Sequence, residues 1–205
     1  MRKINEIFYS LQGEGHHSGY PSVFIRFSGC NLKCSFCDTI HEEGILMDDD
    51  EIIRAVKLYS ADWIVITGGE PALRIDKDFI SLLKRATGKK IAVETNGTVP
   101  LPEGIDWVTV SPKFGIETPD GAEMDGRTSV KVAYADEIKV VDIGQDLEPY
   151  FNLPCKGDKT LMYLQPCYVA DPDEFRKNRL RTVSRVLADP RWTLSVQLHR
   201  FLGIP

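Results

Sequence analysis

The chain has 205 residues, a formal net charge of -5 and an isoelectric point near 5.4. Its 42% hydrophobic and 27% charged residues are ordinary for a soluble globular protein, and its length suits one domain over residues 1–205. It has no basic run of the kind that binds nucleic acid, and no apolar stretch long enough for a signal peptide or membrane span. We therefore expect a cytoplasmic protein with neither a nucleic-acid partner nor a membrane partner.

Short apolar strands alternate with helices along the chain. The expected strands are 23–27, 63–67, 91–95, 108–110, 138–141, 161–164 and 194–198, and the expected helices are 48–59, 77–86 and 173–187. This series predicts an α/β fold with a mostly parallel sheet. Because the helices are few and the chain is short for a complete eightfold barrel, we expect a partial, open (βα) barrel of about six strands. Segments 112–136 and 142–159 are rich in Gly, Pro, Asp and Glu, so we expect irregular structure there.

Polar and turn-forming residues recur where the expected strands end. They are Gly68-Gly69-Glu70-Pro71, Asn96-Gly97, Ser111-Pro112-Lys113 and Gln165-Pro166. The carboxyl ends of parallel strands meet at one edge of the sheet, where α/β proteins carry their active sites. The sequence therefore predicts one site at this edge.

Three of the five cysteines lie within eight residues, just after the first of the expected strands. Cys30, Cys34 and Cys37 form a Cx3Cx2C pattern. Thiolates are soft ligands that iron–sulfur clusters prefer. Three cysteines can bind three irons of a four-iron cluster and leave the fourth iron open to a small molecule.

The spacing alone leaves other interpretations open. A zinc site could combine the three cysteines with His41, or with His16 or His17 if the fold brings either one near. A ferredoxin-like carrier would need a fourth cysteine, and Cys155 and Cys167 are distant in sequence. We expect Cys155 to be an unliganded thiol.

The cysteine motif, with Phe36 before its last cysteine, and the later Gly68–Pro71 turn together resemble the radical S-adenosylmethionine superfamily. The resemblance implies a [4Fe-4S] cluster on Cys30, Cys34 and Cys37 that reductively cleaves S-adenosylmethionine. It implies cofactor contacts from Phe36, Cys37, Asp38, Gly69, Glu70, Ser111, Pro112, Lys113, Gln165, Pro166, Cys167 and Tyr168. Glu94 and Asn96, at another strand end, are further candidates whose role stays open.

A closer resemblance rests on Leu11-Gln12-Gly13-Glu14-Gly15, on Phe36-Cys37-Asp38-Thr39 and on the last residues, Gly203-Ile204-Pro205. This layout is similar to the 7-carboxy-7-deazaguanine synthases over essentially the full chain. It implies a carbon–nitrogen lyase of queuosine biosynthesis, and so of tRNA modification, that converts 6-carboxy-5,6,7,8-tetrahydropterin to 7-carboxy-7-deazaguanine with loss of ammonia. It also implies Mg2+, a flavodoxin or ferredoxin reductant and a homodimer.

The resemblance assigns the remaining site residues. The substrate positions are Leu11, Gln12, Gly13, Glu14, Arg26, Thr67 and Pro205, and Thr39 matches the magnesium ligand. The planar guanidinium of Arg26 suits a carboxylate, although the residue could also be an ordinary ion-pair partner. Two alternatives remain: an activase that installs a glycyl radical on a partner enzyme, and a non-enzymatic zinc-binding module.

Overall fold

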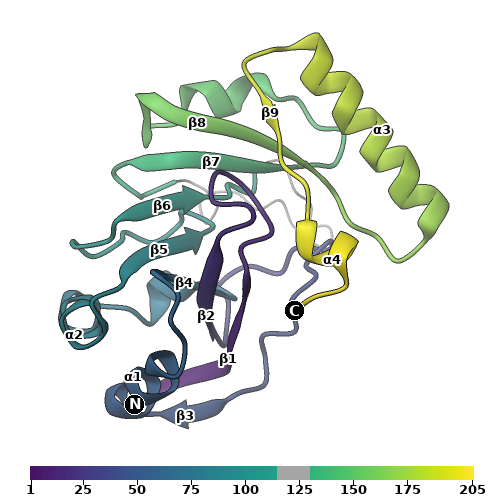
Figure 1. The fold of residues 1–205 in the computed structure, drawn as a ribbon. Helices are drawn as coiled ribbons and strands as arrows, with labels where there is room; N and C mark the ends of the chain where they lie inside the picture. The colour runs from purple at the N-terminus through teal and green to yellow at the C-terminus, as the bar shows by residue number, and fades with distance from the viewer. Residues whose placement is uncertain (115–129) are drawn as a thin grey trace.

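The computed structural model describes residues 1–114 and 130–205, and its centre is one curved, open sheet (Figure 1). Nine strands pair in the order β3-β1-β2-β4-β5-β6-β7-β8-β9. All pairings from β2 to β9 are parallel, whereas β1 pairs antiparallel with both β2 and β3. The sheet does not close, which confirms the expected partial, open barrel.

The strands are β1 (Arg2–Leu11), β2 (Pro21–Phe27), β3 (Ile45–Met47), β4 (Trp63–Gly68), β5 (Lys90–Thr95), β6 (Trp107–Val110), β7 (Ala135–Asp142), β8 (Lys156–Pro166) and β9 (Thr193–Leu194). The expected number of about six was too low because β1, at the antiparallel edge, mixes charged and polar residues with apolar ones, and β3, its antiparallel partner, has only three residues. The expected strand over 194–198 was also wrong. Only Leu194 of that range belongs to β9, and the chain then leaves the sheet so that the Leu198 amide donates to the Gly13 carbonyl at 2.9 Å.

The helices are α1 (Asp49–Lys57), α2 (Lys77–Thr87), α3 (Pro172–Ala188) and the short α4 (Leu198–Leu202), with single 3-10 turns η1 (Pro71–Leu73) and η2 (Glu148–Asn152). The three long helices confirm the expected ones to within two residues, because each begins at an aspartate cap. Asp48, Asp76 and Asp171 each accept a hydrogen bond from the amide three residues on. No helix in the described parts of the chain is long and apolar enough to cross a membrane.

Segments 112–136 and 142–159 are only partly irregular. Residues 115–129 lie outside the described residues, and β7 begins at Ala135. The second segment contains η2, and β8 begins at Lys156, five residues before the expected strand. The early part of β8 was missed because Gly157, Asp158 and Lys159 are not typical strand residues.

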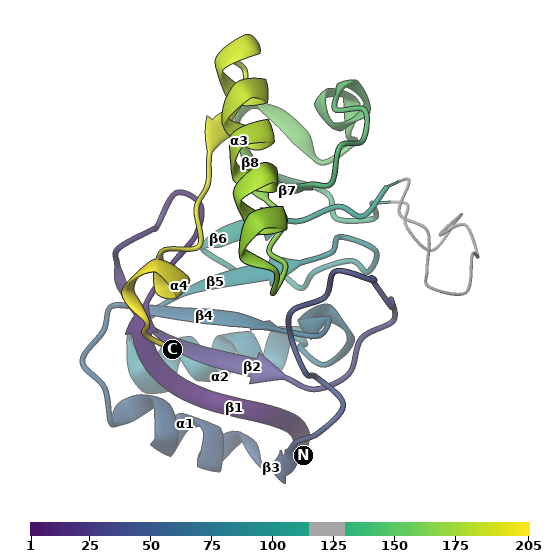
Figure 2. The ribbon, with the colours of Figure 1, turned by 90° about the vertical axis from the view of Figure 1, so that its right-hand side faces the viewer.

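The two faces of the sheet differ in polarity. Val23, Ile25 and Phe27 of β2 pack in the core that includes apolar residues of α1 and α2, which lie along the outside of the sheet (Figure 2). Helix α3 lies along β8 in the same view. The alternate residues Phe24 and Arg26 turn to the inner, concave face. Because side chains alternate along a strand, β2 sends one set of side chains to the core and the other to the concave face.

Candidate active site

The cysteine loop follows β2, and the turn after β4 is hydrogen-bonded to the first residues of this loop. The Gly69 amide donates to the Phe27 carbonyl at 3.0 Å, and the Glu70 amide donates to the Gly29 carbonyl at 2.9 Å. A Cβ on Gly69 would lie only 2.1 Å from the Gly29 oxygen. Only glycine allows this close backbone approach, so the Gly68–Gly69 turn fixes the start of the cysteine loop.

Glu70 has a structural place beside this turn. Its side chain is fully buried, and its oxygens accept from the Ala72 amide at 3.0 Å, the Thr95 hydroxyl at 2.7 Å and the Asn96 amide at 2.7 Å. Burial raises the pKa of this carboxyl group, against the effect of these hydrogen bonds. The side chain of Glu70 ties η1 to the end of β5. The predicted contact of Glu70 with the cofactor stays a prediction.

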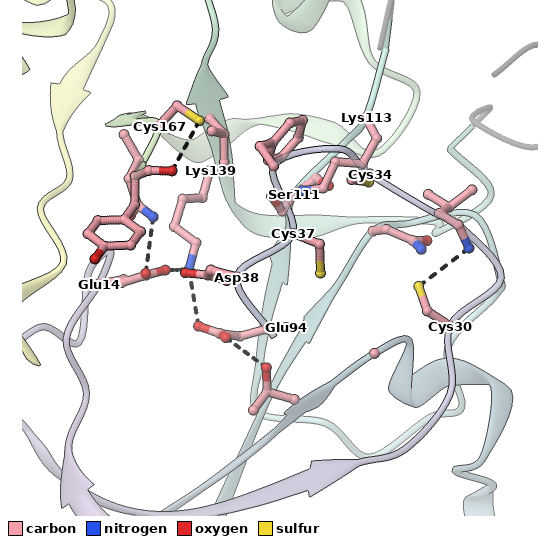
Figure 3. A pocket seen from close by; sticks show the side chains of 18 of the residues that line it. Glu14, Cys30, Cys34, Cys37, Asp38, Glu94, Ser111, Lys113, Lys139 and Cys167 are labelled. Carbon is pink, nitrogen blue, oxygen red and sulfur yellow. Dashed lines mark hydrogen bonds and ion pairs between the residues drawn. The ribbon is translucent and has the colours of Figure 1, made fainter. Parts of the chain in front are cut away.

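One cavity, here called the cysteine cavity, collects most of the predicted cluster and cofactor residues (Figure 3). The residues that the sequence predicted for the site and that line this cavity are Cys30, Cys34, Phe36, Cys37, Asp38, Gly69, Ser111, Lys113, Gln165, Pro166, Cys167 and Tyr168, together with Glu94 and Asn96. Glu70 and Pro112 do not line it, because Glu70 makes the contacts above and Pro112 is buried. The segments after β2, β4, β5, β6 and β8 therefore meet at one place, as the strand-end argument predicted.

The three motif cysteines are free thiols beside this cavity. Burial raises the pKa of the Cys30 and Cys34 thiols, so a positively charged centre is needed to hold them as thiolates. Lys113 lies beside the same cavity, with its ammonium donating to the Ser111 hydroxyl at 2.6 Å. Burial lowers the pKa of Lys113.

A second cavity of about 800 Å3, the arginine cavity, lies next to the first. It is lined by Leu11, Gln12, Gly13, Glu14, Arg26, Thr39, Thr67 and Pro205, which are the predicted substrate and magnesium positions. The Arg26 guanidinium donates to the Glu6 carboxylate at 2.7 Å and lies 5.6 Å from the centre of the Phe8 ring. Arg26 therefore faces the concave side, which strand alternation alone did not settle.

Five residues line both cavities and form the wall between them: Glu14, Asp38, Thr67, Glu94 and Gln197. Behind this wall the Lys139 ammonium contacts Glu14 at 2.5 Å and Glu94 at 3.1 Å (Figure 3). Burial would raise the pKa of Glu14, but the ion pair with Lys139 outweighs it and lowers this pKa from 4.5 to about 2. The pKa of Lys139 is raised, because the attraction of Glu14 and Glu94 outweighs its burial.

The sequence analysis missed Glu6, Lys139, Gln197, His199 and Arg200. A signal for Lys139 was present, since a lysine in the middle of the apolar run Ile138–Val141 needs a buried partner. No local signal marked Gln197, His199 and Arg200, because their role depends on how residues 195–205 fold back over the cavities. There the Arg200 guanidinium donates to Asp38 at 2.6 Å, and the Ser10 hydroxyl donates to a Pro205 oxygen at 2.6 Å.

Comparison with known proteins shows the family of this chain. Residues 24–115 match the sequence profile described as Radical SAM superfamily. A 7-carboxy-7-deazaguanine synthase of Bacteroides thetaiotaomicron is 52% identical over 204 residues, covering 100% of this chain and 99% of the relative. The chain belongs to the 7-carboxy-7-deazaguanine synthase family. The family member of Nitratidesulfovibrio vulgaris is 38% identical over 230 residues, covering 99% of both chains.

A solved structure agrees with this family membership. The crystal structure of QueE from Escherichia coli matches with a TM-score of 0.72 and 26% identity, and the match covers 97% of this chain and 94% of that one. The likeness therefore extends over nearly the whole chain.

The donor set of this family member fits the cluster that a radical S-adenosylmethionine protein carries. Three thiols from one loop border one cavity and supply the soft ligands that iron prefers. In residues 1–114 and 130–205, no three His, Cys, Asp or Glu side chains are close enough to hold one metal ion. Cysteines that each bind a different iron of a cluster need not meet at a single point.

Proposed function

We propose that this protein converts 6-carboxy-5,6,7,8-tetrahydropterin to 7-carboxy-7-deazaguanine with loss of ammonia. The observation that carries the proposal is the pair of cavities with a common wall. One cavity has the three free cysteines, and the other has an arginine and acidic residues. The two relatives described above are named for this activity, and the chain matches each of them over nearly its full length.

On the cofactor side, Cys30, Cys34 and Cys37 would hold the [4Fe-4S] cluster. When bound there, the cluster and S-adenosylmethionine supply the radical that begins the reaction. The protein's own part is to position the cofactor. Asn96, Ser111 and Gln165 offer polar groups at the ends of β5, β6 and β8, and the ammonium of Lys113 adds positive charge beside the cysteines. The Gly68–Gly69 turn fixes the loop from which the thiols project.

On the substrate side, we propose that Arg26 binds the pterin carboxylate. Its guanidinium is already oriented by Glu6, and its fork can donate two parallel hydrogen bonds to a carboxylate. Glu14 and Glu94 present acceptor oxygens on the wall shared with the cysteine cavity. Such acceptors suit the N–H groups of the 2-amino-4-oxo ring of a pterin. The substrate would thus lie between one cation and two anions.

Three further parts of the proposal concern partners. Thr39 lines the arginine cavity, and we propose that its hydroxyl contributes to a Mg2+ site whose other ligands are water and the substrate carboxylate. A flavodoxin or ferredoxin is the proposed reductant. A homodimer is the proposed assembly, and its interface stays a prediction.

An anaerobic turnover assay tests the function. Protein reconstituted with iron and sulfide is incubated with dithionite, S-adenosylmethionine, Mg2+ and the pterin, and the product is identified by its ultraviolet spectrum and mass. We expect 7-carboxy-7-deazaguanine and ammonia in equal amounts. A brown protein that cleaves S-adenosylmethionine but forms no deazapurine would contradict the pterin substrate.

Two other outcomes would favour the alternative functions. A colourless protein would favour the zinc module, and a glycyl radical on an added partner enzyme would favour the activase. Neither alternative is favoured by the relatives.

A further inference from the structure

Lys139 has an unusual place in the site. It lies on β7, its side chain is only 6% exposed, and it borders the cysteine cavity but not the arginine cavity. Its ammonium nevertheless contacts two carboxylates that do border the arginine cavity. Glu14 comes from the loop between β1 and β2, and Glu94 comes from β5, so one cation joins three separate parts of the sheet.

The other direct contacts of these two carboxylates are with neutral groups. Glu14 accepts from the amides of Gln165 and Gln197, both at 3.0 Å. Glu94 accepts from the amide of Gln12 at 3.1 Å and from the hydroxyl of Thr67 at 3.0 Å. Two carboxylates this close to each other repel, and burial strengthens the repulsion because the surrounding dielectric constant is low. Lys139 is the cation that offsets it at both groups.

Other charged and titratable groups lie farther from the Lys139 ammonium. Glu137 lies two residues before Lys139 on β7, where it accepts from the His16 amide at 2.8 Å and the Thr109 hydroxyl at 2.9 Å. From the segments packed against the cluster come Lys113 after β6, Asp38 of the cysteine loop, and His199 and Arg200 of α4. Arg26 also lines the arginine cavity, where it is paired with Glu6 on the neighbouring strand. None of these groups makes a contact that replaces the Lys139 ammonium between Glu14 and Glu94.

We infer that Lys139 is a positioning residue that holds Glu14 and Glu94 as a fixed pair of carboxylates on the wall between the two cavities, so that they select a heterocycle edge rich in N–H donors. This inference rests on the proposed function for the identity of that heterocycle. Lys139 does not touch the substrate in this scheme. Its effect on turnover passes through the two carboxylates, whose orientation and charge it sets.

The main variant is Lys139→Met, which keeps the length of the side chain and removes its charge. The KM for the pterin should rise at least about tenfold, more than kcat falls, because a buried carboxylate that loses its partner cation is strongly destabilised. The acidic limb of the pH profile of kcat/KM should move to higher pH, because loss of the cation raises the pKa of Glu14 and its carboxylate is then protonated at a higher pH. Lys139→Arg keeps the charge and should leave this limb in place.

Lys77→Met is the matched control. Lys77 is an exposed lysine that pairs with Glu103 at 2.7 Å and borders neither cavity. We expect its KM and pH profile to equal those of the unsubstituted protein. If Lys139→Met folds poorly, Lys139→Met combined with Glu14→Gln removes a cation and an anion together. The double variant should recover folding while the KM stays raised.

A titration without substrate separates this inference from the proposed function. In protein labelled with 13C-glutamate, nuclear magnetic resonance follows the Glu14 carboxyl group, which is assigned by its loss in Glu14→Gln. Its midpoint should lie at higher pH in Lys139→Met than in the unsubstituted protein and be unchanged in Lys77→Met. An unmoved Glu14 midpoint, or a double variant with the ordinary KM, would overturn the role of Lys139. Absence of deazapurine product from the unsubstituted protein would overturn the proposed function alone, because the titration still decides the inference.

Discussion

The cysteine cavity and the arginine cavity share a wall, but they are assembled differently. The cysteine cavity takes most of its lining from short motifs that follow β2, β4, β6 and β8, each at the carboxyl end of a parallel strand. The arginine cavity takes much of its lining from β1, from the loop that follows it and from residues 197–205. The first cavity forms wherever the carboxyl ends of the parallel strands meet, whereas the second depends on how the antiparallel edge and the C-terminal segment close over it. This difference predicts that cofactor cleavage and substrate use can be impaired separately.

The largest expected effect is the loss of the cofactor side through Cys34→Ala. Removing one of three thiolate ligands should leave a protein that binds little cluster iron and forms no 5′-deoxyadenosine, because no other cysteine of the loop can replace it. Iron analysis and product chromatography after anaerobic reconstitution measure this. Cys155→Ala is the control, since this buried thiol borders neither cavity and its loss should leave the cluster intact. Full cluster content in Cys34→Ala would contradict the assignment.

Arg26→Ala should impair the substrate side alone. We expect kcat/KM for the pterin to fall about 10- to 100-fold, since a hydrogen-bonded charge pair contributes about 1.5–3 kcal/mol. Cleavage of S-adenosylmethionine in the absence of pterin should not change, because Arg26 does not border the cysteine cavity. Arg26→Lys should recover part of the loss, since it restores the charge without the fork. An equal loss of both activities would indicate that Arg26 supports the fold through Glu6.

Glu14→Gln tests the shared wall through the pH dependence of stability. Because the pKa of Glu14 is lowered from 4.5 to about 2 in the folded protein, its ion pair stabilises the fold above the unfolded pKa. This contribution should disappear as the pH falls from about 4.5 toward 2. The unfolding temperatures of the two proteins should therefore differ most near neutral pH and converge in acid. Glu103→Gln, which removes an exposed pair, should show almost no difference at any pH. A gap that stays constant with pH would argue against the Glu14–Lys139 pair.

Thr39→Ala should have the smallest effect. Loss of one neutral oxygen ligand should raise the Mg2+ concentration needed for half-maximal turnover by roughly two- to fivefold, since water can take its place. Thr39→Ser keeps the hydroxyl and should retain the original magnesium response. An unchanged response in Thr39→Ala would remove Thr39 from the proposed site.

The strands and helices that the sequence predicted correctly are those with strong local signals. The run Trp63–Ile66 is continuous and apolar, Val23–Phe27 is apolar except for Arg26, and most residues of both runs are buried. The aspartate caps mark where α1, α2 and α3 begin. β1 carries Arg2, Lys3, Asn5 and Glu6 among its apolar residues and lies near the edge of the sheet, so its pattern is weaker. The surroundings of the Glu70 side chain could not be predicted for a related reason. Its motif predicts a site, but only the packing of η1 against β5 shows that the side chain turns inward.

By itself, the sequence determined the parallel α/β core, the loop with three thiols and the strand ends around it, because each of these depends on residues that are neighbours in the chain. Only the tertiary structure decided that Arg26 faces the cavity, that residues 197–205 line its wall, and that Lys139 joins Glu14 to Glu94. Those contacts link residues 45 to 183 positions apart. These contacts are fixed by the curvature of the sheet and by the need of a buried charge for a partner. A local sequence pattern does not show which distant residue will be that partner.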